Sequence, residues 1–195
     1  MKKLILLTVL LLPLLTFSQT QLGSDIDGEA ASDNSGRSVS IDSDGSHVAI
    51  GAPYNYGNGS NAGHVRIYSW DGTNWTQVGN DIDGEAAYDE SGLSVSMDSD
   101  GSHVAIGAYY NDGNGSNAGH VRVYEYSSGS WSQVGNDIDG EAASDYSGHS
   151  VSIDSDGSHV AIGAPYNDGT ASNAGHVRVY EYSSGSWSQV GNDID

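Results

Sequence analysis

The sequence predicts an all-β protein made of β-propeller-type blades, each a four-stranded antiparallel sheet. The first observation is a repeat, because the string Asp-Ile-Asp recurs every 56 residues, beginning at Asp25, Asp81, Asp137 and Asp193. The second is that each unit contains four short strand-like segments separated by turns rich in Gly, Asp, Asn and Ser, without a helical period of useful length. Such units are typical of propeller blades, and a β-solenoid is the alternative.

The first unit shows how the four strands are expected to follow one another. Ser38–Ile41 alternates polar and apolar residues, and His47–Ala52 follows after the hairpin-type turn Asp-Ser-Asp-Gly. A loop of Gly, Asn and Ser leads to the third strand, His64–Trp70, and the turn Asp-Gly-Thr-Asn leads to the fourth, at 75–79. The same order is expected in three consecutive repeats, at 25–80, 81–136 and 137–192, with 193–195 opening a truncated fourth.

Residues 1–18 are expected to form a secretory signal peptide. Lys2 and Lys3 precede an apolar run at 4–17, and the small residues Thr16 and Ser18 lie just before the expected cleavage point. The run is shorter than the roughly 20 residues of a membrane span. We therefore expect a protein that is secreted or displayed at the cell surface, with residues 19–195 forming the folded segment and no membrane insertion after cleavage.

Acidic residues dominate the composition. The chain has 26 Asp and Glu against 6 Lys and Arg, a formal net charge of −20, and no cysteine. A surface of this charge repels phosphate backbones and anionic lipid, so we expect neither nucleic acid nor a membrane surface as a partner. Without disulfides, stability must come from packing, backbone pairing or bound metal.

Several recurring residues are expected to be structural. Stacking of the units should bury the apolar strand residues, because one blade buries little by itself. Glycines at the end of each second strand are expected to permit close approach, the tryptophans to pack between blades, and the histidines to make structural hydrogen bonds. These residues are Gly51, Gly107, Gly163, Trp75, Trp131, Trp187, His47, His103, His159, His64, His120 and His176.

The repeat resembles the FG-GAP repeat of integrin-α-type β-propellers. The motifs that carry the resemblance are Gly36-x-Ser38-Val39, the string Gly51-Ala52-Pro53 and Val65-x-Ile67-Tyr68, and the pattern recurs at 91–124 and 147–180. The second copy departs from it at Tyr109, where the others carry proline. The resemblance implies a propeller, an extracellular role in interaction or adhesion, and calcium-binding loops.

An acidic stretch at the start of each unit is the candidate metal site. Its acids fall at the first, third, fifth and ninth positions, a spacing shared with the calcium loops of integrin-type propellers, and hard oxygen ligands on a flexible loop suit Ca²⁺. The family places that loop in the first hairpin, where this chain has only Asp42 and Asp44, so the alternative is a solvated acidic loop. The candidate calcium ligands are Asp25, Asp27, Glu29, Asp33, Asp81, Asp83, Glu85, Asp89, Asp137, Asp139, Glu141 and Asp145.

We expect no enzyme activity, because nearly identical units supply the same groups three times and offer no unique constellation. The expected function is that of a non-catalytic interaction module that binds protein or glycan. The second and third units differ at only seven positions. The variable loop positions at strand ends are explained by recognition or, equally well, by random drift after duplication. They are Ser32, Tyr88, Ser144, Asn34, Glu90, Tyr146, Arg37, Leu93, His149, Asn58, Asn114 and Thr170.

Two alternatives to this function are a structural surface or adhesin repeat without a ligand, and part of a propeller-type glycosidase or lyase whose active residues lie in missing blades. Three blades do not close a ring, because propellers usually have about four to eight. The sequence is thus expected to be a piece of a longer protein, or a chain that shares blades with others. Residues 20–23 match a fourth strand and are expected to complete a blade, while open blade edges predict self-association.

Overall fold

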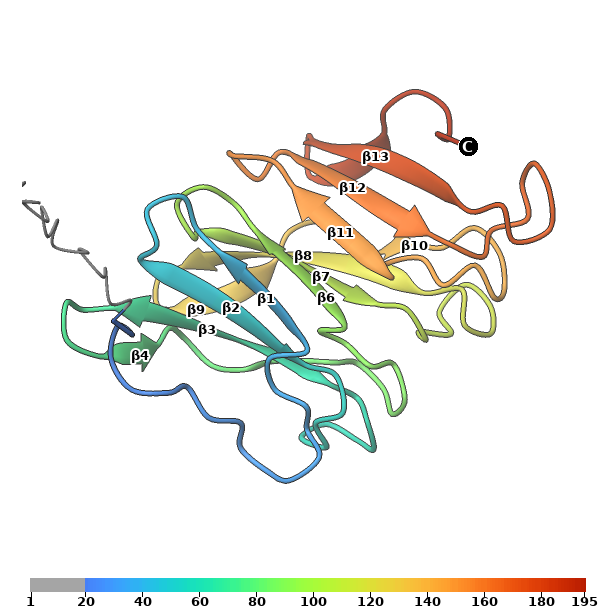
Figure 1. Ribbon diagram of the computed structural model, residues 1–195. Coiled ribbons are helices and arrows are strands. Elements are labelled where there is room, and N and C mark those ends of the chain that lie inside the picture. Colours follow the sequence, from blue (N-terminus) through green and yellow to red (C-terminus); the bar gives the residue numbers. More distant parts are fainter. Residues whose placement is uncertain (1–19) are drawn as a thin grey trace, which may run out of the picture.

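Each 56-residue unit forms one antiparallel sheet in the computed structural model, which describes residues 20–195 (Figure 1). The leader expected at 1–18, with its cleavage point, lies outside the described residues. The first sheet has the order β1 (Ser38–Ile41), β2 (His47–Ala52), β3 (His64–Trp70) and β4 (Trp75–Gln77). The part of the chain that the structure describes contains no helix, so the predicted all-β class with antiparallel four-stranded units is confirmed.

The second and third sheets repeat the first in the same register. Ser38 of β1 pairs with Gly51, and Ser94 with Gly107 and Ser150 with Gly163 repeat that pairing. The strands are β6 (Ser94–Met97), β7 (His103–Ala108), β8 (His120–Ser127) and β9 (Ser130–Gln133), then β11 (Ser150–Ile153), β12 (His159–Ala164), β13 (His176–Ser183) and β14 (Ser186–Gln189).

The fourth strand is followed by a second short strand on the same edge of the sheet. β5 (Ile82–Asp83) pairs with the start of β3, while β4 pairs with its end. β10 (Ile138–Asp139) pairs in the same way with β8. The openings of the second and third Asp-Ile-Asp stretches therefore belong to the sheets before them, and the chain then crosses to the next sheet.

The hydrophobic core lies between neighbouring sheets. One core joins Val65 and Ile67 of the first sheet to Met97 and Ile106 of the second. A second core joins the second and third sheets in the same manner, and the first strands β1, β6 and β11 lie next to one another (Figure 1). The outer faces of the first and third sheets have no neighbouring sheet among the described residues, so the three sheets do not close a ring.

The recurring tryptophans and glycines join the sheets, as predicted. Trp131 packs against the first core, and its indole nitrogen donates a hydrogen bond to the carbonyl oxygen of Val78 at 2.8 Å. A Cβ on Gly51 would collide with the backbone carbonyl of Gly92 in the next unit. Such contacts require glycine because two backbones approach each other directly.

Residues 20–23, expected to complete a blade, lie beside the first sheet instead. The indole nitrogen of Trp75 donates to the carbonyl oxygen of Leu22 at 3.1 Å, as Trp131 does to Val78. The segment thus takes the place that a preceding unit's fourth strand would take, although it forms no strand. The third sheet has its own outer strand, β14.

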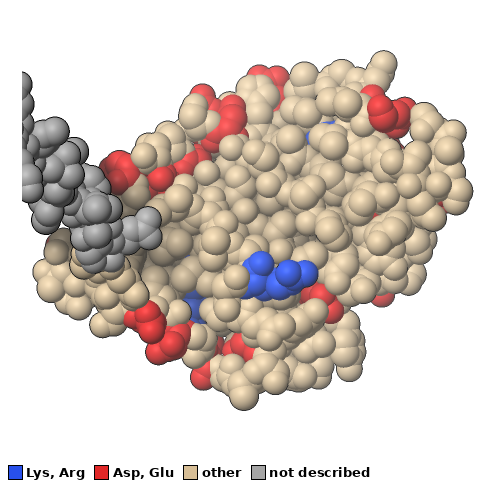
Figure 2. Space-filling model, in the orientation of Figure 1, with Lys and Arg blue, Asp and Glu red and all other residues tan. Residues whose placement is uncertain are grey.

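Charged side chains are unevenly distributed over the surface of the described residues. On the face shown in Figure 2, acidic side chains gather mainly toward the rim and leave much of the surface uncharged. No helix capable of crossing a membrane is present among the described residues.

Candidate functional site

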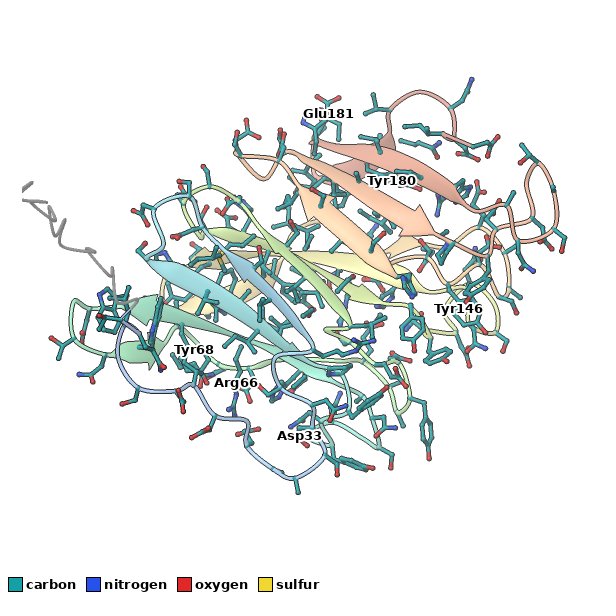
Figure 3. All side chains as sticks on the ribbon, in the orientation of Figure 1. Asp33, Arg66, Tyr68, Tyr146, Tyr180 and Glu181 are labelled. Atoms are coloured by element: carbon teal, nitrogen blue, oxygen red, sulfur yellow. The ribbon has the colours of Figure 1, made fainter. Side chains whose placement is uncertain are left out.

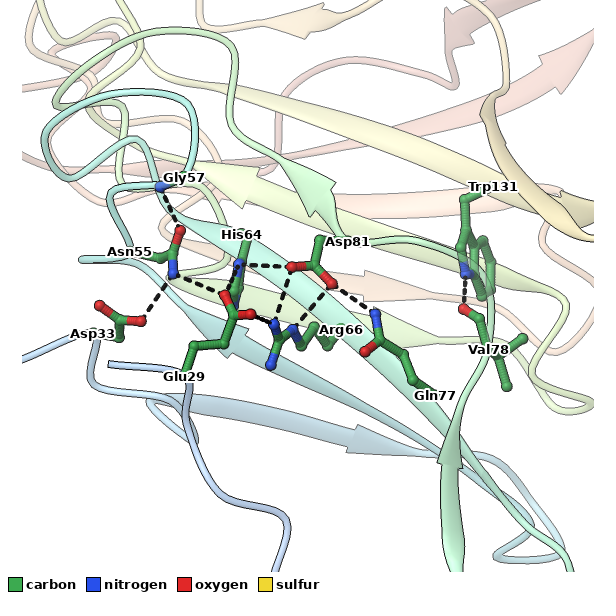
Figure 4. A network of polar contacts seen from close by, with 10 residues as sticks. All are labelled: Glu29, Asp33, Asn55, Gly57, His64, Arg66, Gln77, Val78, Asp81 and Trp131. Atoms are coloured by element: carbon green, nitrogen blue, oxygen red, sulfur yellow. Dashed lines mark hydrogen bonds and ion pairs between the residues drawn. The ribbon is translucent and has the colours of Figure 1, made fainter. Parts of the chain in front are cut away.

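A polar cluster recurs at the edge of each sheet, where the acidic stretch crosses between units. In the first cluster, Glu29 precedes β1, His64 and Arg66 lie on β3, and Asp81 immediately precedes β5 (Figure 4). His64 and Arg66 share a face of β3 because strand side chains alternate, and Val65 points to the opposite side, into the core. The same cluster recurs as Glu85, His120, Arg122 and Asp137 and as Glu141, His176, Arg178 and Asp193.

The second cluster leaves one oxygen of each carboxylate facing a histidine. His120 Nδ1 lies 3.7 Å from Asp137 Oδ2 and 3.9 Å from Glu85 Oε2. The other oxygens are engaged, because Gln133 donates to Asp137 Oδ1 at 2.7 Å and Arg122 Nη1 lies 3.4 Å from Glu85 Oε1. The third cluster has the same contacts, with Oδ2 of Asp193 at 3.6 Å and Oε2 of Glu141 at 3.8 Å from His176 Nδ1.

The first cluster is closed by its arginine. Arg66 donates from Nε and Nη2 to both oxygens of Asp81, at 3.0 and 3.2 Å, and it also pairs with Glu29. Asn55 Nδ2 donates to the remaining oxygen of Glu29 at 3.4 Å. In the second cluster, by contrast, Arg122 Nη2 turns to the backbone oxygen of Asp83 at 3.1 Å.

Burial shapes the electrostatics of the second cluster. Burial lowers the pKa of His120 to about 4, and the charge of Arg122 adds to this effect. His120 is therefore neutral at neutral pH. Burial also raises the pKa of Glu85, with repulsion from Asp137 acting in the same direction and Arg122 opposing it. The cluster therefore places one neutral imidazole between two carboxylates.

The structure divides the twelve predicted calcium ligands among different places. The ninth-position acids are buried and each accepts a hydrogen bond from an asparagine of its own unit: Asp33 from Asn55 at 2.8 Å, Asp89 from Asn111 at 2.9 Å and Asp145 from Asn167 at 2.9 Å. The first and fifth acids meet across units, as Glu29 does with Asp81. Asp25 accepts a hydrogen bond from Gln21 at 2.8 Å.

The third-position acids join none of the metal-capable groups found among the described residues. Asp83 and Asp139 lie on the short edge strands, and burial raises the pKa of both, with repulsion from the first-position acid of the same stretch adding to it. The four acids of one stretch thus do not gather around a common point. Calcium binding by these loops stays a prediction, but the expected ligand grouping within one stretch is not the grouping that the fold makes.

The first-hairpin histidines have the structural role predicted for them. His47 Nδ1 lies 2.7 Å from Asp42 Oδ2, and His103 and His159 repeat this contact with Asp98 and Asp154 at 2.7 and 2.8 Å. The cluster histidines differ from that prediction. His120 Nδ1 has no hydrogen-bond partner although its side chain is only 1% exposed. Both ring nitrogens of His176 are likewise buried and unpartnered.

A pocket of about 460 Å³ lies between the second and third units at the loop end of the sheets, where Figure 3 shows Tyr146. Tyr146 has Tyr110 and Tyr166 on two sides, with ring centroids 5.5 and 5.1 Å away and ring planes inclined by 71° and 69°. Tyr109 stacks on Tyr110 at 4.0 Å. The pocket is completed by Ser144, His149 and Asn173.

Four of the seven positions that differ between the second and third units line this pocket. They are Tyr109 from the second unit and Ser144, Tyr146 and His149 from the third. The sequence predicted three of these as variable recognition positions. It did not indicate Tyr110, Tyr166 or Asn173, because these residues recur in every unit and look structural when the sequence is read alone.

The backbone at Tyr146 adopts a conformation that tyrosine disfavours. Its φ is 55°, in the left-handed region, where the first unit carries Asn34 with the same φ. Asparagine tolerates this conformation much better than an aromatic residue does. Strain of this kind concentrates at functional sites.

A second cavity, of about 420 Å³, lies at the open edge of the third sheet beside Gly163, Gly175 and Val177. In the preceding sheet the corresponding place is filled by the next unit, since Gly119 bridges to Ser147 and Gly107 lies against Gly148. This cavity therefore corresponds to the place that the next unit fills in the preceding sheet.

Comparison with known proteins agrees with this geometry. Solved structures of similar fold are β-propeller-like, and the FG-GAP repeat model matches residues 25–68, 81–124 and 138–180. The chain belongs to the FG-GAP repeat family, whose members are typically extracellular. No curated protein matches the sequence.

Three solved structures of similar fold illustrate the likeness. A predicted 6-phosphogluconolactonase from Bacteroides fragilis is 11% identical with a TM-score of 0.55, and the match covers 80% of this chain and 38% of that one. One from Bacteroides uniformis is 12% identical, with a TM-score of 0.53 and coverage of 80% and 39%. The periplasmic gluconolactonase PpgL of Pseudomonas aeruginosa is 18% identical, with a TM-score of 0.50 and coverage of 74% and 39%. At these identities the likeness concerns the fold, and this chain spans about two fifths of each protein's length.

Proposed function

We propose that the chain is a non-catalytic, extracellular interaction module that binds a neutral sugar in the tyrosine pocket between its second and third units. The observation that carries this proposal is the concentration of unit-to-unit differences in one pocket. Most residues that maintain the sheets are the same in both units, the core position of Met97 and Ile153 being an exception, while four of the seven differences meet around a single cavity. Variable loops on a constant scaffold are typical of recognition.

The chemistry of the lining favours a neutral, polyhydroxylated ligand. Aromatic rings offer flat apolar faces to the C–H face of a sugar ring, and their hydroxyl groups can hydrogen-bond. Ser144, His149 and Asn173 add hydrogen-bonding groups at the rim, and no carboxylate, lysine or arginine lines the pocket. The strongly negative chain disfavours an anionic ligand.

The same lining supports a binding role over a catalytic one. Glycoside hydrolysis ordinarily requires a pair of carboxylates on either side of the scissile bond, and the pocket lining includes no such pair. The carboxylates of the polar clusters recur in all three units and so form no unique constellation. The alternative, a structural repeat without a ligand, predicts that no sugar binds.

A titration of the purified protein with neutral mono- and oligosaccharides, followed by calorimetry, tests the proposal. Tyr166 is 49% exposed, so Tyr166→Ala removes one wall of the pocket at little structural cost, and we expect at least a tenfold loss of affinity. Tyr54→Ala is the matched control, because Tyr54 holds the same position in the first unit and lies outside the pocket. Absence of binding, or equal losses in both variants, would contradict the proposal.

Tyr146→Asn separates binding from folding. It installs the residue that the first unit carries at this position, where φ favours asparagine, so the thermal midpoint should hold or rise. Sugar affinity should nevertheless fall, because the central ring is lost. A variant that is stable and still binds with unchanged affinity would place the ligand elsewhere.

A further inference from the structure

We propose that the second and third polar clusters each bind one divalent transition-metal ion. The ligands are Glu85, His120 and Asp137 in one site and Glu141, His176 and Asp193 in the other. In each cluster one ligand atom from every residue lies within 4.8 Å of the other two. The inference is independent of the sugar pocket, which involves none of these residues.

The hydrogen-bond pattern leaves the right atoms free. Gln133 and Arg122 engage only Oδ1 of Asp137 and Oε1 of Glu85, respectively, so Oδ2 and Oε2 face the histidine. At 3.7 and 3.9 Å from His120 Nδ1, these oxygens are too distant for a hydrogen bond. Around a tetrahedral ion with bonds of about 2.0–2.1 Å, neighbouring ligand atoms lie about 3.4 Å apart. A small inward movement of the two carboxylates therefore closes the site.

The buried histidine nitrogen is the independent sign of a ligand. His120 Nδ1 is enclosed, has no hydrogen-bond partner and is the atom that points at the two free oxygens. His176 repeats this situation in the next cluster. A buried polar atom without a partner destabilises the fold and calls for an explanation, and a bound ion supplies the missing interaction.

The donor set selects the kind of metal. An imidazole nitrogen with two carboxylate oxygens suits Zn²⁺ and its first-row neighbours, whereas Ca²⁺ and Mg²⁺ prefer oxygen ligands alone. Three protein ligands leave a fourth position for water or another donor. Arg122 lies at the margin of the second site and pairs with Glu85, while Asp139 adds negative charge nearby.

The first cluster differs from the other two because its carboxylate oxygens already have hydrogen-bond or ion-pair partners. Arg66 occupies both oxygens of Asp81, and Asn55 donates to the oxygen of Glu29 that faces His64. The carboxylate oxygens that would bind metal there are already engaged. The structure thus predicts two ions per chain, although the sequence contains three copies of the motif.

Metal content and calorimetry of the purified, chelator-treated protein test the proposal, with Zn²⁺ and Co²⁺ as probes and Ca²⁺ and Mg²⁺ for comparison. We expect two Zn²⁺ ions per chain, one in His120→Gln, one in His176→Gln and none in the double variant. Bound Co²⁺ should show a visible spectrum of a nitrogen and oxygen ligand set. Millimolar Ca²⁺ should not displace Zn²⁺.

His64→Gln is the matched control and should keep two ions, because the first cluster is closed by arginine. Circular dichroism of every variant checks that the loss of an ion does not reflect loss of the fold. No Zn²⁺ bound by a folded protein, or unchanged stoichiometry in the folded double variant, would overturn the proposal. Loss of an ion in His64→Gln would overturn the assignment to the second and third clusters.

Discussion

The second sheet and the two outer sheets have nearly the same sequence but different surroundings. Met97 and Ile153 are 7% and 9% exposed because the preceding sheet covers them, whereas their counterpart Ile41 is 59% exposed. On the opposite side, Val121 is fully buried while Val177 is 37% exposed. The comparison shows that each unit carries two apolar faces and that burial depends on a neighbour, as in other repeat proteins.

The largest effect that we expect is self-association of the protein through its two open sheet faces. The open face of the third sheet, which carries Val177, is equivalent to the faces by which the first and second sheets pack onto the units that follow them. The open face of the first sheet, which carries Ile41, is equivalent to the faces of the second and third sheets that receive this packing. We therefore expect a second copy of this chain to pack head to tail, so that the average mass in analytical ultracentrifugation rises with protein concentration. Ile41→Asp should weaken this association at least tenfold.

Glu181→Gln serves as the control for that experiment, because it changes an exposed charge on β13 (Figure 3). Both variants should fold as the unaltered protein does. A protein that stays monomeric at high concentration would contradict the head-to-tail association.

Truncation of a side chain buried between two sheets should lower the free energy of unfolding far more than truncation of its counterpart on an open sheet face. Met97→Ala should reduce the free energy of unfolding by about 2–4 kcal/mol, because it leaves a cavity between sheets. Ile41→Ala should change it by less than about 0.5 kcal/mol, as expected at an exposed site. Urea denaturation at low protein concentration measures both, and equal losses would show that the first face is also covered.

Glycine substitutions test the same difference between a sheet that contacts the next unit and a sheet that does not. A Cβ on Gly107 would collide with the carbonyl group of Gly148 in the next unit, so Gly107→Ala should destabilise the protein by about 1–3 kcal/mol. A Cβ on Gly163 meets only Ser150 of its own sheet, whose side chain can rotate away. Gly163→Ala should therefore be the milder change in the same denaturation experiment, and a reversed order would argue against the packing described.

The smallest effect that we expect is a pH dependence of stability caused by Glu90 at the interface of the first and second units. Burial raises the pKa of Glu90, against the opposing hydrogen bond from Tyr109. The folded state then binds a proton more readily than the unfolded state does, so this group adds stability as the pH falls from neutral toward its ordinary value of 4.5. Glu90→Gln should flatten this part of the profile in thermal melts between pH 7 and about 4.5, and an unchanged profile would contradict the prediction.

The fold was predictable because its signals are local and recur three times. Alternating strands, Asp-Gly turns and the 56-residue period specify four-stranded units, and Trp131 packs between sheets as its recurrence indicated. Three of the seven residues that line the tyrosine pocket were also visible as variable loop positions. Tyr110 and Tyr166 could not be recognised, since a residue that recurs in each unit gives no sign that two copies will meet around Tyr146.

The sequence by itself determined the repeat, the four main strands of each unit, the turns between them and the family of this protein. Only the tertiary structure decided which acids meet. The stretch that begins at Asp81 divides at Gly84, because β5 pairs back onto the first sheet while Glu85 and Asp89 continue into the second. Residues adjacent in sequence are thereby separated, and Asp81 meets Glu29 of the preceding unit. Sheet pairing is a long-range interaction, so residue spacing within one stretch does not reveal it.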